Sequence, residues 1–170
     1  MKSQAVEVRN RGAARGLLFY LTILALLSAD RISKVLVSHW ILPSSTICIL
    51  PGLFNLTHTL NPGAAFGILA RMDPSLRNPF FIGISLLALL FVFCYYHRQG
   101  RKSCLSTLGA GMIAGGALGN LWDRICLGAV VDFLDFHVGR YHWPAFNLAD
   151  SGISLGVGLV IWQIWKEAKS

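Results

Sequence analysis

Long apolar stretches dominate the chain, and short polar or turn-rich segments separate them. Crossing the hydrocarbon core of a bilayer takes about 20 helical residues, and four stretches approach or exceed that length. They cover roughly residues 16–38, 79–97, 105–121 and 146–165. The pattern predicts an all-α membrane protein in which residues 1–170 form a single integral-membrane domain. Its two longest loops, residues 39–78 and 122–145, then lie on the same side of the membrane.

Both of these loops also carry a weaker strand pattern. Residues 46–50 and 54–60 are rich in β-branched and apolar types, and Pro51-Gly52 between them is typical of a turn. We therefore expect a strand, a turn and a second strand there. In the second loop the segment VVDFLDF, residues 130–136, fits either a strand or a segment lying on the membrane surface.

Composition and charge agree with a membrane protein. The chain is 54% hydrophobic and 14% charged, against roughly 25% charged residues in ordinary soluble domains. Its net charge is +7, and the basic residues gather before the first stretch, between the second and third, and after the last. By the positive-inside rule these segments, including both termini, are cytoplasmic and the two long loops are external. Lipid headgroups account for this charge, so we expect no nucleic-acid partner.

The first apolar stretch has a second interpretation, because a basic segment before an apolar core also describes a cleaved signal peptide. The stretch continues past Asp30 and Lys34 without a convincing small-residue cleavage site. An even number of spans also agrees with the charge bias only if this helix is retained. We therefore expect it to remain as the first transmembrane helix.

The four cysteines do not form a recognisable framework. Cys94 and Cys104 fall near the cytoplasmic side, while Cys48 and Cys126 would face outward, where they could in principle pair. We expect free and mostly buried thiols. Since the sequence has no C-x-x-C or Cys/His spacing typical of zinc, we expect no metal and no cofactor.

Polar residues recur at the predicted outer ends of the helices. Asp30 and Lys34 are spaced i, i+4 and are expected to form an ion pair. The segment GNLWDR, residues 119–124, is expected to end the third helix. There Asn120 and Arg124 share a face and can bind a peptide backbone or a carboxylate. The alternative is that Asp123 and Arg124 are only the polar end of a membrane span. Small residues within 109–120 favour close helix packing.

The segment FNLADS, residues 146–151, opens the last apolar stretch with two polar side chains. Asn147 is a preferred N-cap, and Asp150 can close a capping box and favour the positive end of the helix dipole. Asp132 should reach the same interface from the preceding loop. Two carboxylates at a partly desolvated site push their pKa values apart, which suits general acid and base chemistry on a peptide bond. Capping alone and aspartyl-protease catalysis both remain open at this point.

Several rival assignments compete with this pair. Asp135 is a second carboxylate near Asp132, although on a strand the two would face opposite ways. Serine-based and histidine-metal schemes lack any recognisable spacing. A proton-relay transporter would place its acids at mid-bilayer, whereas here they gather at one surface. A non-catalytic membrane subunit would use Asp132 and Asp150 only to cap and solvate helix ends.

Taken together, these segments closely resemble the lipoprotein signal peptidase (signal peptidase II) family of bacteria. The resemblance covers all four spans and both external loops. It rests on five blocks in order: DRISK (30–34), NPGAAF (61–66), GGALGNLWDR (115–124), VVDF (130–133) and FNLADS (146–151). One departure is Arg31, which stands where the family commonly has a glutamine.

The resemblance implies a four-helix membrane aspartyl endopeptidase with a small extracytoplasmic β-cradle. It implies cleavage of prolipoproteins just before a diacylglyceryl-modified cysteine, in the inner membrane, with the active site at the extracytoplasmic surface. Membrane lipids and inhibitory peptide antibiotics of the globomycin type are the further partners it implies. By motif, the catalytic pair is Asp132 and Asp150. Substrate-binding or positioning roles fall to Asn61, Asn120, Arg124 and Asn147, and supporting polar roles to Asp30, Lys34 and Asp123.

Overall fold

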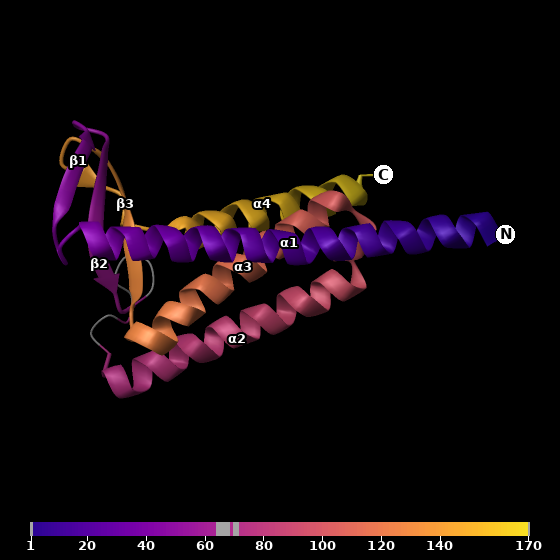
Figure 1. The fold of residues 1–170 in the computed structure, drawn as a ribbon, viewed down its shortest axis with the longest axis horizontal. Helices are drawn as coiled ribbons and strands as arrows, with labels where there is room; N and C mark the ends of the chain where they lie inside the picture. Colours follow the sequence, from indigo (N-terminus) through magenta and orange to yellow (C-terminus); the bar gives the residue numbers. More distant parts are fainter. Residues whose placement is uncertain (1, 64–68, 70–71, 170) are drawn as a thin grey trace.

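The computed structural model describes residues 2–63, 69 and 72–169, and within them four long helices carry a small antiparallel sheet at one end (Figure 1). The predicted fold class is therefore confirmed. The helices are α1 (Lys2–Trp40), α2 (Pro74–Arg98), α3 (Cys104–Leu127) and α4 (Leu148–Ala168), with a 3-10 turn η2 (Gly100–Lys102) before α3. The strands are β1 (Thr46–Leu50), β2 (Phe54–Asn61), β3 (Val130–Val138) and β4 (Tyr141–His142).

Each of the four helices contains a segment long and apolar enough to cross a membrane: Gly12–Trp40 of α1, and the whole of α2, α3 and α4. Both chain termini lie at the end of the bundle away from the sheet (Figure 1). This arrangement puts the two strand-bearing loops at one end, as the alternation of spans and loops predicts. The chain therefore has the architecture of a multi-pass membrane protein.

The sequence placed some helix ends wrongly. GNLWDR does not end α3, because the helix continues to Leu127 and stops where Gly128 adopts a left-handed backbone with φ 70°. Glycine is favoured there because it has no Cβ to clash. At α4 the prediction of a cap is confirmed: the Asn147 side chain accepts from the backbone N–H of Asp150 at 2.9 Å, and the Asp150 carboxylate accepts from the backbone N–H of Asn147 at 3.3 Å.

Helix α3 lies at the centre of the bundle and packs against α1, α2 and α4. Its small residues make this possible, as the sequence predicted. A Cβ on Gly109 would lie 2.7 Å from the carbonyl oxygen of Gly156 in α4, and a Cβ on Gly111 would lie 2.8 Å from the Cβ of Thr22 in α1. Because such approaches exclude a side chain, glycine allows the three helices to meet at backbone contact.

The sheet has the order β1-β2-β3-β4, with every neighbouring pair antiparallel. The strand, turn and strand predicted in the first loop are confirmed, and VVDFLDF forms part of a strand. The sheet is fastened to the bundle where buried Phe133 packs against Val37 and Ile41 at the end of α1. This contact fixes β3 against the helices and so determines which of its side chains face the bundle.

The cysteines are free, but the expectation that they are mostly buried is wrong. All four are exposed on the surface of the folded chain. For Cys94 and Cys104, which lie in or at the start of membrane helices, that surface is the one available to lipid. An apolar thiol tolerates such a surface without needing a protein partner.

Candidate active site

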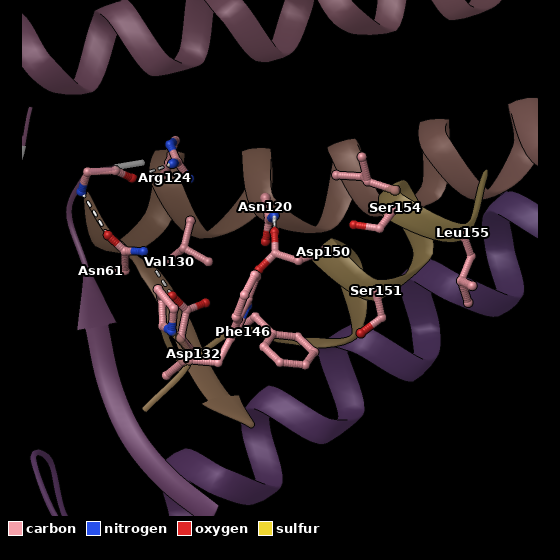
Figure 2. Close-up of a pocket in the computed structure, with 15 residues that line it drawn as sticks. Asn61, Asn120, Arg124, Val130, Asp132, Phe146, Asp150, Ser151, Ser154 and Leu155 are labelled. Carbon is pink, nitrogen blue, oxygen red and sulfur yellow. Dashed lines mark hydrogen bonds between the residues drawn. The ribbon is translucent and has the colours of Figure 1, made fainter. Parts of the chain in front are cut away.

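A cavity of about 750 Å³ lies where the sheet meets the outer ends of α3 and α4. Figure 2 shows the carboxylates of Asp132 and Asp150 facing this space, one from β3 and the other from the first turn of α4. Asn61, Asn120 and Arg124 also line the cavity. Its remaining wall is largely apolar and includes Val130, Trp143, Pro144, Ala145, Phe146, Ile153 and Leu155.

Asp132 is held by two side-chain amides. Asn61, at the end of β2, donates to its Oδ2 at 2.9 Å, and Asn147, at the cap of α4, donates to its Oδ1 at 2.7 Å. The residue is only 3% exposed. Burial raises the pKa of Asp132 to about 7, and the nearby charge of Asp150 adds to this, while the two amide hydrogen bonds and Lys34 oppose it. Near neutral pH this carboxyl can therefore hold a proton.

Asp150 occupies the third position of α4 and has a different set of donors. Asn120 of α3 donates to its Oδ1 at 2.7 Å, and the backbone N–H of Asn147 donates to its Oδ2 at 3.3 Å. Both donors and the positive end of the helix dipole favour negative charge on this side chain. Asn147 thus contacts both aspartates, one through its side chain and the other through its backbone.

Beneath the pair lies a buried charge cluster that we define as Asp30, Lys34 and Asp123. The Lys34 ammonium lies 2.8 Å from Oδ2 of Asp30 and 2.8 Å from Oδ2 of Asp123. All three side chains are at most 1% exposed. The predicted Asp30–Lys34 ion pair is therefore confirmed, and Asp123 completes it from α3. Arg31 forms an ion pair with the other oxygen of Asp123.

The charge cluster also binds the backbone just ahead of each aspartate of the pair. Oδ1 of Asp30 accepts from the backbone N–H of Ala149 at 3.0 Å, and Oδ2 of Asp123 accepts from the backbone N–H of Val131 at 3.3 Å. Ala149 precedes Asp150, and Val131 precedes Asp132. The cluster therefore fixes the positions of both segments relative to α1 and α3.

Arg124 lies at the edge of the cavity on the same face of α3 as Asn120. Its guanidinium donates to the backbone carbonyl of Gly63 at 3.0 Å and lies 4.8 Å above the ring of Phe81. These contacts link α3 to α2 and to the chain that follows β2. Of the predicted block NPGAAF, only residues 61–63 fall within the described part of the chain, and 64–66 lie outside it.

Asp135, the rival carboxylate, lies apart from the pair. It accepts a hydrogen bond from Asn55 at 2.8 Å and contacts Nδ1 of His142 at 2.8 Å. Partial burial would raise the pKa of Asp135, but the hydrogen bonds from Asn55 and His142 and the charges of His142 and His137 outweigh it and lower the pKa. Asp135 is not among the residues that line the cavity.

Sequence reasoning missed several parts of the site. Gly119 leaves the space for the Asp30 carboxylate, since a Cβ there would lie 2.5 Å from Oδ2 of Asp30. Trp143 and Phe146 form cavity walls. The small-residue stripe of α3 was a usable signal for Gly119. No local pattern pointed to the backbone donors of Val131 and Ala149, because their acceptors come from distant helices.

Comparison with known proteins agrees with this architecture. Residues 22–166 match the family model described as signal peptidase (SPase) II. A lipoprotein signal peptidase of Desulforapulum autotrophicum is 41% identical over 139 residues, covering 82% of this chain and 86% of the relative. One from Halothermothrix orenii is 42% identical over 150 residues, covering 88% and 97%. A solved structure described as a bacterial membrane enzyme has a TM-score of 0.79 and 28% identity over 88% of each chain.

Proposed function

Because this chain belongs to the signal peptidase II family, we propose that it removes signal peptides from prolipoproteins, with Asp132 and Asp150 as the catalytic pair. The observation that carries the site assignment is the bridge made by Asn147, which contacts both carboxylates at the wall of one cavity. If Asn147 only capped α4, its hydrogen bond to Asp132 on β3 would not be needed. Capping and catalysis are compatible here, because the same asparagine starts α4 and connects the pair.

The different surroundings of the two aspartates suggest their roles. Asp132, whose pKa is raised to about 7, supplies the proton, and Asp150, surrounded by donors, acts as the base. A water between them loses a proton to Asp150 as its oxygen attacks the scissile carbonyl. Asp132 donates its proton to the developing oxyanion. The carbon–nitrogen bond then breaks, the leaving amine takes the proton from Asp150, and the oxyanion proton returns to Asp132.

Substrate selection follows from the composition of the cavity wall. The cleaved bond would precede a diacylglyceryl-modified cysteine, whose acyl chains are held by the bilayer and by apolar side chains such as Ile153 and Leu155. Arg124 and Asn61 bind or position the peptide at the polar edge, with Asn120 and Asn147 aligning the carboxylates. Peptide antibiotics of the globomycin type would compete for the same cavity.

The membrane placement follows the charge bias. We place the chain in the bacterial inner membrane, with both termini cytoplasmic and the sheet on the extracytoplasmic side. The cavity then lies at the outer membrane surface, where the bond after a signal peptide emerges from the bilayer. Water for hydrolysis is available there, unlike at mid-bilayer.

The direct test is Asp150→Asn, which keeps the side-chain volume and removes the base. We expect cleavage of a lipidated precursor by the detergent-purified variant to fall by about 10³-fold or more, with the folded protein still recovered. The assay is the gel shift of the precursor, repeated in cells lacking their own signal peptidase II. Near wild-type cleavage by Asp150→Asn would overturn the pair assignment.

The lipid requirement is tested with matched precursors. A precursor with an unmodified cysteine should be cleaved much more slowly than the same precursor bearing diacylglycerol, because it loses the apolar contacts at the cavity wall. Equal turnover of the two would remove the lipid from the proposal while leaving the peptidase activity intact.

A further inference from the structure

Three oxygen atoms surround the buried Lys34 ammonium. Two are the carboxylate oxygens of Asp30 and Asp123, each at 2.8 Å, and the third is Oδ1 of Asn120 at 3.0 Å. An ammonium can only donate, and a buried one must use all its protons. The third contact connects the charge cluster to Asn120, which is itself hydrogen-bonded to Asp150.

This contact and a second one fix which way the Asn120 amide points, since Nδ2 of Asn147 also donates to its Oδ1, at 3.3 Å. With its oxygen toward Lys34, the amide turns its nitrogen toward Oδ1 of Asp150, 2.7 Å away. Figure 2 shows the side chains of Asn120 and Asp150 pointing toward each other. The reversed amide would face two donors toward each other at Lys34 and two acceptors toward each other at Asp150. Lys34 and Asn147 therefore both favour the orientation in which Asp150 receives a hydrogen bond, and Lys34 is the charged one of the two.

We propose that Lys34 acts through Asn120 as a positioning residue that keeps Asp150 the ionised, proton-accepting member of the pair. The inference rests on the proposed catalytic roles and extends them to a residue that touches neither substrate nor reacting atoms. The Lys34 ammonium polarises the Asn120 amide, and the polarised N–H of that amide stabilises the carboxylate form of Asp150. Asp132 has amide partners too, but its Asn61 is oriented by the backbone N–H of Gly63 at 3.0 Å rather than by a cation.

The other charged groups near Asp150 are arranged differently. On β3, Asp132 faces it across the cavity. On α3, Arg124 attracts it, but its guanidinium donates to the carbonyl of Gly63. On α1, Asp30 is paired with Lys34, and Arg31 pairs with the Asp123 oxygen that Lys34 does not contact. Among the described residues, Lys34 is the cation that shares a neutral hydrogen-bonding partner with Asp150.

The test variant is the double substitution Lys34→Met/Asp30→Asn, which removes the cation and one anion together. Arg31 and Asp123 still balance each other, and an asparagine at position 30 can still accept from the backbone N–H of Ala149. The readout is kcat/KM for a lipidated precursor as a function of pH. The acidic limb of this profile is the fall in kcat/KM at low pH. We expect it to move to higher pH by about half to one unit in the double variant, because loss of a nearby positive charge typically shifts a carboxylate titration by that order.

Arg31→Gln is the matched control, because it also removes one positive charge from the neighbourhood but breaks no contact to Asn120. Its acidic limb should remain within about 0.2 pH unit of wild type, on the same argument from proximity. If Arg31→Gln moved the acidic limb as far as the double variant does, its position would depend on the total charge near the site rather than on the Lys34–Asn120 contact. The proposal would then be wrong.

Asn120→Asp gives an independent decision if the double variant does not fold. It keeps the acceptor for Lys34 but replaces the donor to Asp150 with a second carboxylate oxygen, so the acidic limb should move up by about one unit or more. An unmoved limb in this folded variant would overturn the proposal. Cleavage with an unmoved limb refutes only the role of Lys34, whereas absence of cleavage by wild type refutes the proposed function itself.

Discussion

Two aspartates three residues apart on β3 meet opposite environments. Asp132 faces the helices, where burial raises its pKa to about 7. Asp135 contacts Asn55 and His142 on the sheet and has a lowered pKa. Each receives an amide hydrogen bond from an asparagine of β2, Asn61 in one case and Asn55 in the other. The chemical groups are therefore closely matched, and the difference lies in what surrounds them.

The comparison shows why two carboxylates on one strand can differ in pKa and in role. Side chains at positions separated by an odd number of residues point to opposite faces of a strand. Near the bundle both faces of β3 are covered, since Phe133 packs against the end of α1 on the face opposite Asp132. Around Asp132 burial favours the neutral form of the carboxyl. Around Asp135, farther along the strand, the partly exposed histidines favour the charged form.

The largest expected difference is between the variants Asp132→Asn and Asp135→Asn. Asp132→Asn removes the proposed acid and should lower kcat/KM for a lipidated precursor by about 10³-fold or more. Asp135→Asn should stay within about threefold of wild type, since it lies away from the reacting atoms. Comparable losses in both variants, with both proteins folded, would make the two faces of β3 functionally equivalent and contradict the assignment.

The second contrast uses the two asparagines of β2. Asn61→Leu removes a donor to Asp132 and should lower kcat/KM by up to about tenfold, the order expected for the loss of one hydrogen bond. Because that donor holds the pKa of Asp132 down, the alkaline limb should also move to higher pH. Asn55→Leu should leave the pH profile unchanged and reduce only thermal stability. A shifted profile in Asn55→Leu is the outcome that would count against this separation.

The third prediction concerns the pH dependence of the wild type. Asp132 must be protonated to act, and its pKa is about 7. It is mostly protonated below that pH and mostly ionised above it, so kcat/KM should fall about tenfold per unit above pH 7. Asp135→Asn should reproduce this limb. Constant activity up to pH 9 would show that the raised pKa is not the one that catalysis depends on.

The smallest effect is expected at the outer face of the sheet. His142→Ala removes the contact to Asp135, and because the His142 side chain is about half exposed, the loss should be about 0.5 kcal/mol. That corresponds to a decrease in Tm of about 1–2 °C for a chain of this size. Thermal unfolding in detergent measures it, and activity at 25 °C should be unchanged. A large loss of cleavage would instead connect this face to the cavity.

Much of this molecule was predictable from local patterns. The four spans, the strand, turn and strand of the first loop, and the cap at Asn147 each depend on residues within a few positions of one another. The polar residues that line the cavity were also singled out, since polar groups at the ends of apolar stretches are conspicuous. The end of α3 was misplaced because the polar run GNLWDR reads as a helix end, although the chain stays helical until Gly128.

The sequence by itself determined the membrane class, the placing of the two long loops at one end of the bundle and the identity of the polar side chains. Only the tertiary structure decided that Lys34 contacts Asp30, Asp123 and Asn120 at once, and that Asp132 rather than Asp135 lines the cavity with Asp150. The physical reason is distance along the chain. The contacts from Asn61 to Asp132, Lys34 to Asn120 and Ala149 to Asp30 join residues 71, 86 and 119 positions apart. Such contacts depend on how the helices and sheet pack together, and no local pattern contains that information.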